Sequence, residues 1–98
     1  MRLYEIIWKD QIVNKLAWKH HIAPEEVEQA LFSKPHMRYV EHGRVTGEDL
    51  YAAYGRTEAG RYVLVFFLYK SRHIALPISA RDMTKSERRY YERQKESH

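Results

Sequence analysis

One run of residues constrains the fold more than any other part of the chain. Residues Tyr62 to Tyr69 read Tyr-Val-Leu-Val-Phe-Phe-Leu-Tyr. This near-continuous β-branched and aromatic content is typical of a central strand buried on both faces. The run is far too short to span a bilayer, which takes about 20 residues in a helix. A chain of 98 residues has the length of one domain, so we expect a single domain over residues 1–98 built around this strand.

The segments around this strand alternate between extended and helical patterns. Apolar residues at spacings of three and four predict helices from Asp10 to about His20 and over residues 24–32, and Thr84 and Glu87 have the spacing of a capping box that opens a helix to about Gln94. Further strands are expected over residues 3–8, 37–41, 50–54 and 73–79. Pro77 cannot donate to a ladder, so the last strand is expected to be at an edge or irregular there. The order β-α-α-β-β-β-β-α predicts an α+β fold, a small antiparallel sheet with helices packed on one side.

The absence of cysteine excludes several classes of site. Disulfide scaffolds, thiolate zinc sites and cysteine nucleophiles all require this residue. A secreted domain this small usually needs disulfides, so a reducing compartment is favoured. Residues 2–6 have no apolar core of a signal peptide. We therefore expect a cytoplasmic protein with no membrane partner.

The charge distribution indicates a polyanionic partner. The net charge is +4 and the pI is near 9.4, which favours nucleic acid. Glu25, Glu26 and Glu28 crowd into one stretch, so the rest of the chain carries +7. This acidic stretch is either a solvated helix face or a corner that faces a second partner.

Metal and serine chemistry are not expected. The chain has six histidines, but the adjacent pair His20 and His21 would point about 100° apart on a helix. The other histidine spacings fit no standard zinc pattern. No serine has the flanking glycines of a strained nucleophile turn, and the four glycines are too dispersed for a phosphate loop. We therefore predict neither a metal site nor a cofactor.

Basic and aromatic residues remain as the candidates for chemistry. Arg81 precedes the last helix, whose free N–H groups attract anions, and Lys85, Arg88 and Arg89 share a face of that helix. Lys19 and His20 end the first helix, where cations are also stabilised by the dipole alone. Cleavage of RNA requires a group that activates the 2′-hydroxyl, one that protonates the leaving oxygen and cations for the phosphate. Lysine, histidine, arginine and tyrosine can fill these roles without metal.

These residues occur in an order that resembles the BrnT-type toxins. The shared features are Trp8 followed eleven and twelve residues later by Lys19-His20, the acidic Glu25-Glu26-Val27, Ala53-Tyr54-Gly55-Arg56-Thr57, Gly60-Arg61, Ile78-Ser79-Ala80-Arg81 and a tail with the pattern T-x-x-E-R-x-x-Y from Thr84 to Tyr91. Each motif is weak alone, but their order and spacing are fairly specific. The resemblance covers nearly the whole chain.

The resemblance implies a small toxin related in fold to the RelE and ParE toxins. It implies a metal-independent endoribonuclease that inhibits translation, needs no cofactor and is neutralised by a small ribbon-helix-helix DNA-binding antitoxin, with which it forms an oligomer. Carried onto matched positions, the catalytic candidates are Lys19, His20, Arg61 and Arg81. The candidate RNA contacts are Lys85, Arg88, Arg89 and Tyr91, with Arg88 and Tyr91 alternatively serving as structural support.

The chain also departs from the family pattern. The family's Trp-Asp and its lysine four residues beyond the tryptophan are replaced by Lys9 and Ile12, and the glycine after Lys-His is His21. Two arginines common in the family correspond to Leu50 and Leu76. Loss of two cations from a phosphate site removes transition-state stabilisation. An alternative function is therefore a non-catalytic nucleic-acid-binding or protein-binding module on the same fold.

Overall fold

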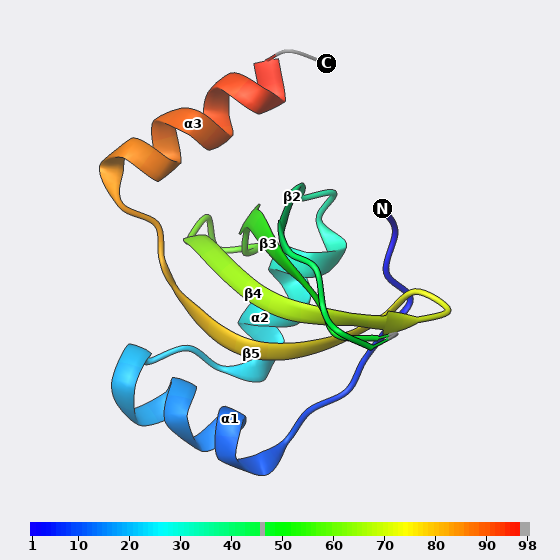
Figure 1. Cartoon of the computed structure of the whole chain (residues 1–98). Helices are drawn as coiled ribbons and strands as arrows, with labels where there is room; N and C mark the ends of the chain where they lie inside the picture. The colour runs from blue at the N-terminus through cyan, green and yellow to red at the C-terminus, as the bar shows by residue number, and fades with distance from the viewer. Residues whose placement is uncertain (46, 97–98) are drawn as a thin grey trace.

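A single sheet forms the centre of the molecule. The computed structural model describes residues 1–45 and 47–96. Within these residues five strands pair in the order β1-β5-β4-β3-β2 (Figure 1). The strands are β1 Glu5–Ile6, β2 His36–Glu41, β3 Asp49–Arg56, β4 Tyr62–Ser71 and β5 Ile74–Asp82. The run that begins at Tyr62 is the middle strand, and its consecutive residues Leu64 and Val65, which point to opposite faces of the sheet, are both buried. This confirms the prediction of a central strand.

The pairing of the strands is antiparallel with one exception. The three pairs formed by β2, β3, β4 and β5 are antiparallel, whereas β1 is parallel to β5. Parallel pairing requires a long connection, and the helices and remaining strands between β1 and β5 provide it. In β5, Pro77 lies opposite Phe67 while Ser79 lies opposite Phe66. Ile78 is thus the extra residue of a bulge, which confirms the predicted irregularity at Pro77.

The helices lie where the sequence predicts them. They are α1 Asp10–Lys15, α2 Pro24–Phe32 and α3 Lys85–Glu96, and α1 continues directly into a π-helical turn, η1, over Leu16–His20. The N–H group of His21 donates to the Leu16 carbonyl five residues earlier, which is the wider hydrogen-bond ring of a π turn. The N–H group of Ile22 donates to the same carbonyl. His21 then ends the helix with a φ of 54°. In this left-handed region glycine is favoured, whereas this chain has a histidine there.

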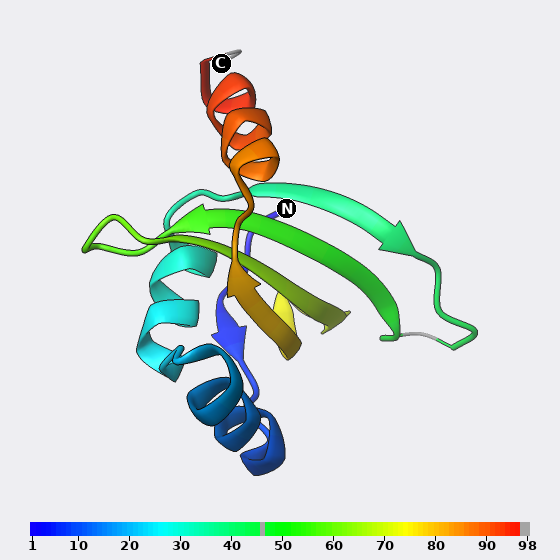
Figure 2. The same ribbon diagram turned by 90° about the vertical axis from the view of Figure 1, so that its left-hand side faces the viewer.

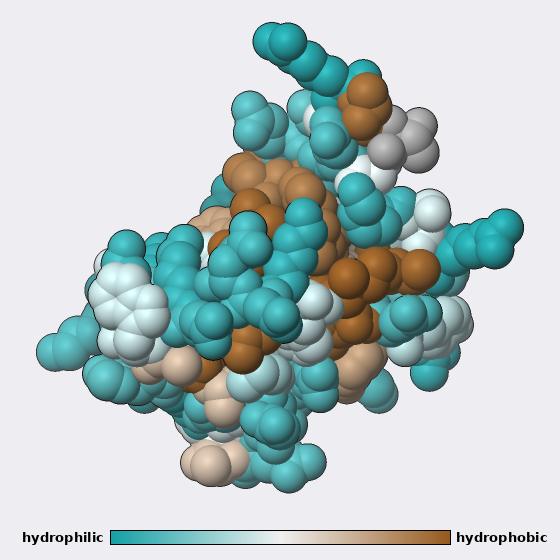
Figure 3. Space-filling view, turned by 90° about the horizontal axis from the view of Figure 1, so that it is seen from below, coloured by the Kyte–Doolittle hydropathy of each residue, from teal (hydrophilic) through white to brown (hydrophobic). Residues whose placement is uncertain are grey.

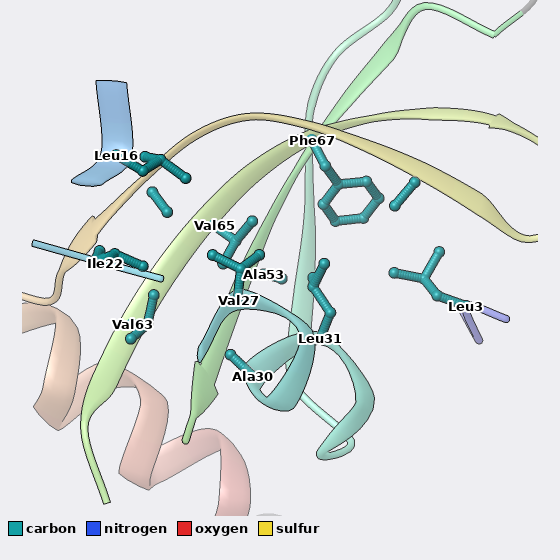
Figure 4. Close-up of a cluster of buried hydrophobic side chains, with 12 residues drawn as sticks. Leu3, Leu16, Ile22, Val27, Ala30, Leu31, Ala53, Val63, Val65 and Phe67 are labelled. Carbon is teal, nitrogen blue, oxygen red and sulfur yellow. The ribbon is translucent and has the colours of Figure 1, made fainter. Parts of the chain in front are cut away.

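Two apolar clusters occupy opposite faces of the sheet. Val63, Val65 and Phe67 of β4 pack against the side of α1, η1 and α2, with Leu16 and Val27 contributed by the helices (Figure 4). The intervening residues of β4 point the other way, where Tyr62, Leu64 and Phe66 meet Tyr54, Met83 and Tyr91. Leu16, Val27 and the three cluster residues of β4 are completely shielded from solvent. The sheet therefore has a covering of helix on each side.

The position of α3 corrects one prediction. The α+β class is confirmed, but α3 lies on the opposite side of the sheet from α1 and α2 (Figures 1 and 2). Met83, which is 7% exposed, directs the chain from the end of β5 onto the second apolar cluster, and Tyr91 anchors α3 there. Because β4 is apolar on both faces, the pattern of the sequence does not distinguish which face the last helix covers.

The surface on the side of α1 is not uniformly polar. In Figure 3, which looks at the molecule from below, apolar residues gather in a band bordered by hydrophilic ones. Large apolar side chains are exposed over the described residues, among them Trp18 of η1 at 72% and Ile7 at 41%. In residues 1–45 and 47–96, no helix has both the length and the apolar character needed to cross a membrane.

Candidate functional site

Arg61 joins the π turn to the sheet. Its Nη1 and Nη2 donate to the carbonyls of His21 and His20 at 2.9 and 3.1 Å, while Nε and Nη2 hold both oxygens of Asp82 at 2.7 and 3.2 Å. Nη1 also lies 3.2 Å from a carboxylate oxygen of Glu26. The bond to Asp82 raises the pKa of Arg61, and the same bond, with a smaller contribution from nearby His20, lowers the pKa of Asp82. All three guanidinium nitrogens are thus engaged, and they position the Lys19–His20 segment.

Lys19 and His20 are held differently by the turn. Lys19 is exposed, and His20 is half-buried near enough to Asp82 to affect its pKa. No hydrogen bond of either side chain occurs within the part of the chain that the structure describes. The π turn therefore presents a lysine and a histidine beside an arginine–carboxylate pair.

The acidic stretch is largely internal in its contacts. Glu26 accepts a hydrogen bond from the N–H of Ala23 at 3.0 Å, which caps α2, and also contacts Arg61. Glu28 accepts a hydrogen bond from Trp8 Nε1 at 2.8 Å. Two of these three glutamates therefore hold the first half of the chain together. This favours neither of the two sequence interpretations, a solvated face or a docking corner.

Arg81 forms a bidentate pair with Glu87 at the start of α3. Its Nη1 and Nη2 donate to the two carboxylate oxygens at 2.7 and 2.9 Å. Glu87 also accepts from the Thr84 N–H at 2.8 Å, and Thr84 Oγ1 accepts from the Glu87 N–H at 3.2 Å, so the predicted capping box is confirmed. The Arg81 guanidinium, together with the Thr84 N–H, lowers the pKa of Glu87 to about 2. The carboxylate therefore stays ionised at neutral pH.

The four catalytic candidates do not converge. Arg81 pairs in register with Leu64, whose side chain is in the cluster under α3, whereas Asp82 pairs with Val63 on the opposite face. Arg61 with His20 and Asp82 forms one group on the side of η1. Arg81 and Glu87 form another on the side of α3.

A groove along α3 contains the predicted RNA contacts. The Tyr62 ring lies between two guanidiniums, with Arg56 and Arg88 at 4.3 and 4.2 Å from its centroid. The Tyr62 hydroxyl donates to Glu92 at 2.8 Å. A hollow of about 440 Å³ is lined by Tyr62, Lys85, Arg88, Arg89, Glu92, Arg93 and Glu96. We call this hollow, together with Arg56, the arginine–tyrosine groove.

Tyr91 lies beneath this groove and not within it. It is 3% exposed, and its ring meets that of Tyr62 edge-on at 5.9 Å. Burial raises its pKa. These contacts favour the structural role for Tyr91. Tyr62 and Arg56 are the surface residues that the sequence prediction missed, since their contact with Arg88 requires β3, β4 and α3 to be assembled.

A comparison with protein families identifies the family to which the chain belongs. Residues 8–87 match the family model described as the ribonuclease toxin, BrnT, of type II toxin–antitoxin systems. The chain belongs to the BrnT family. No curated protein matches it. Membership of this family implies an RNA substrate and an antitoxin partner.

The departures of this BrnT-family member lie together on the sheet. Leu50 and Leu76, the two positions where the sequence resemblance leads us to expect arginines, both lie opposite Leu68, one on each side of it. The three leucines form a row across β3, β4 and β5 on the same face as Arg81. Leu76 is 8% exposed. In this chain the far end of the α3 face is therefore apolar, and the cations on that face are concentrated near α3.

Four further polar or aromatic residues of this BrnT-family chain meet beside α3. His36 and Arg38 of β2, Tyr54 of β3 and Tyr90 of α3 are in contact, with His36 Nε2 at 2.8 Å from the Tyr90 hydroxyl. The sequence prediction missed this group because the strand was expected to begin at Met37. The alternation of His36 and Arg38 at a spacing of two was the available signal.

The described residues offer no obvious metal centre. Across residues 1–45 and 47–96, no group of three histidine, aspartate or glutamate side chains is arranged to hold a metal ion.

Proposed function

We propose that this chain is a single-domain endoribonuclease toxin, spanning residues 1–98, that cuts RNA without a metal ion and thereby inhibits translation. The proposal rests on membership of the BrnT family and on the arginine–tyrosine groove. Because translated RNA is the proposed target, the protein acts in the cytoplasm.

The groove is the observation that carries the proposal. Guanidinium groups bind phosphate oxygens through paired N–H donors and also stack on planar rings. Arg56 and Arg88 are exposed, and each has one face against Tyr62. Arg56 Nη2 donates to the Gly60 carbonyl, and the other N–H groups of the two guanidiniums can bind phosphates. Their outer faces can stack on bases, the combination by which proteins hold single-stranded RNA. Lys85 and Arg89 extend the positive surface along α3.

The catalytic candidates take separate roles in this proposal. Lys19 and His20 supply a cation and a proton-transfer group at η1, and Arg61 holds the end of this turn through the carbonyls of His20 and His21. Arg81 contacts a phosphate. The support for this role is the match of Ile78-Ser79-Ala80-Arg81 to the family pattern, together with the place of Arg81 just before the N-terminus of α3.

Expression in bacteria tests the proposal. The wild-type chain is expected to arrest growth and to cut RNA in the presence of a chelator. Lys19→Ala and Arg81→Ala are expected to relieve the arrest. Lys34→Ala, an exposed lysine after α2, is the control expected to retain it. Circular dichroism of each purified variant checks that the fold is intact. No arrest by the wild type, or arrest that persists in both variants, contradicts the catalytic proposal.

The proposed partner is a small ribbon-helix-helix antitoxin. Its support is the family's description as one half of a toxin–antitoxin pair and the exposed apolar band in Figure 3. Co-expression with the protein of the neighbouring reading frame is expected to yield a stable complex and to restore growth.

The alternative is a binding module without catalysis on the same fold. The apolar row Leu50, Leu68 and Leu76 favours it, because two cations of the family pattern are absent there. This alternative predicts that the purified chain binds RNA but leaves it intact with and without chelator.

A further inference from the structure

The group at β2 and α3 has the composition of a proton-transfer site. His36 Nε2 lies 2.8 Å from the Tyr90 hydroxyl, and the two rings meet edge-on at 5.3 Å. Tyr90 also packs on Tyr54, with ring centroids 5.1 Å apart, and on the Arg38 guanidinium at 5.5 Å. A histidine hydrogen-bonded to a tyrosine hydroxyl can accept or release a proton near neutral pH.

The register of the sheet places these residues on one face. His36 is opposite Tyr54, and Arg38 is opposite Ala52, whose neighbours in the cluster under α3 are Leu64 and Tyr91. Tyr54 lies within electrostatic reach of Arg81, and Arg38 Nη1 approaches the Tyr54 hydroxyl at 3.5 Å. The His36–Tyr90 pair therefore has two guanidiniums nearby, that of Arg38 from β2 and that of Arg81 from β5.

The helix that supplies Tyr90 also supplies the groove. Arg88 and Arg89 line the arginine–tyrosine groove, while Tyr90 faces β2 and β3. A strand of RNA held by the groove thus lies against the same helix that carries the His36–Tyr90 pair. His20 lies next to Arg61, whose N–H donors are all in use.

We propose that His36, acting with Tyr90, transfers the proton of the reacting 2′-hydroxyl, and that Arg38 and Arg81 stabilise the charge on the phosphate. This inference rests on the proposed function, and it assigns the proton transfer to His36 in place of His20.

The proposed step balances without a metal or other co-reactant. Tyr90 takes the 2′-hydroxyl proton as its own proton passes to His36, and the 2′-oxygen forms a bond to the adjacent phosphorus. The bond from phosphorus to the 5′-oxygen breaks, and the leaving oxygen takes a proton from water. The imidazolium then returns its proton to the resulting hydroxide. The products are a 2′,3′-cyclic phosphate and a 5′-hydroxyl.

Two measurements on the purified full chain test this inference. The first is the rate of cleavage of a mixed-sequence single-stranded RNA with chelator present. The second is the affinity for the same sequence with 2′-O-methyl groups, which binds but cannot react. His36→Ala is expected to cut at least about 100-fold more slowly, the usual contribution of such a group, while its affinity changes less than about threefold. Added imidazole is expected to restore part of the rate. Tyr90→Phe, which keeps the ring, is expected to lose rate and keep affinity.

The controls separate this inference from a structural role. His42→Ala, an exposed histidine after β2, is expected to cut at the wild-type rate. Wild-type cleavage by His36→Ala overturns the inference and leaves the proposed function intact. So does a parallel loss of affinity and of thermal stability without rescue by imidazole, because it shows that His36 only joins β2 to α3. Absence of cleavage by the wild-type chain overturns both proposals.

Discussion

Glu87 is a residue whose protonation couples the candidate site to stability. Its folded pKa of about 2 lies below the ordinary value of 4.5, so its bonds to Arg81 and Thr84 stabilise the fold fully above pH 4.5. That contribution is lost as the pH falls from 4.5 towards 2.

Replacement of Glu87 by glutamine tests this coupling. We expect Glu87→Gln to lower the free energy of unfolding at pH 7 by about 1 kcal/mol, since the partly exposed ion pair with Arg81 is lost, while the amide oxygen still accepts from the Thr84 N–H. We also expect the free energy of unfolding of Glu87→Gln to change less between pH 5 and pH 2.5 than that of the wild type. Urea unfolding at these pH values measures both effects. Glu58→Gln, an exposed carboxylate in the β3–β4 turn, is the control; an equal pH dependence in wild type and Glu87→Gln would contradict the coupling.

Local pairs of this kind are predictable from sequence, and distant ones are not. Thr84 and Glu87 are three residues apart, so their capping box follows from helical geometry alone. The partner of Arg81 is six residues away and depends on how the chain leaves β5. Arg61 and Asp82 meet only because β4 and β5 pair, so nothing in their separate surroundings identifies the bond.

At the scale of elements, the π turn shows what residue patterns do not encode. The sequence predicts the extent of the first helix correctly, from Asp10 to His20. It does not predict the wider final turn, because the same residues are compatible with α and π hydrogen bonding. The sequence gives only an indirect sign of the left-handed residue that ends the turn: the resemblance leads us to expect a glycine where this chain has His21.

Replacement of His21 by glycine is expected to stabilise the chain. At a φ of 54° a side chain costs about 1–2 kcal/mol, and the greater freedom of glycine in the unfolded chain offsets part of the gain. We expect His21→Gly to raise the free energy of unfolding by about 0.5–1 kcal/mol, measured by urea denaturation. The His21 carbonyl still accepts from Arg61, so the geometry of Lys19 and His20 is preserved. A loss of stability would show that the imidazole makes a compensating contact. His42→Gly, in the loop after β2, is the matched histidine control.

The same scale explains the error over α3. The pattern of an amphipathic helix predicts that it packs on an apolar surface, but β4 has an apolar face on each side of the sheet. The face that α3 covers is set by Met83 and Tyr91, which both belong to the apolar cluster beneath that helix. Taken one at a time in the sequence, each is an ordinary core residue.

At the scale of the whole molecule, the charge of the groove predicts a salt dependence. Each phosphate neutralised on single-stranded nucleic acid contributes about −0.7 to the slope of log affinity against log salt concentration. We expect Arg88→Ala to reduce the steepness of this slope by about 0.7 for 2′-O-methyl RNA, measured by fluorescence anisotropy over a salt series. Arg72→Ala, in the β4–β5 turn away from the groove, should leave the slope unchanged. Equal slopes for wild type and Arg88→Ala would exclude Arg88 as a phosphate contact.

The parallel pairing of β1 with β5 has a consequence for how the toxin is made. β1 finds its partner residues, Ile74 and Ala75, only when most of the chain has been synthesised, and contacts between distant segments form late in folding. The groove and the His36–Tyr90 pair both require α3, which follows β5 in the chain. An interrupted translation product that ends before Ile74 therefore lacks both the closed sheet and the proposed RNA-binding surface. Both proposed surfaces therefore form only after α3 has been synthesised.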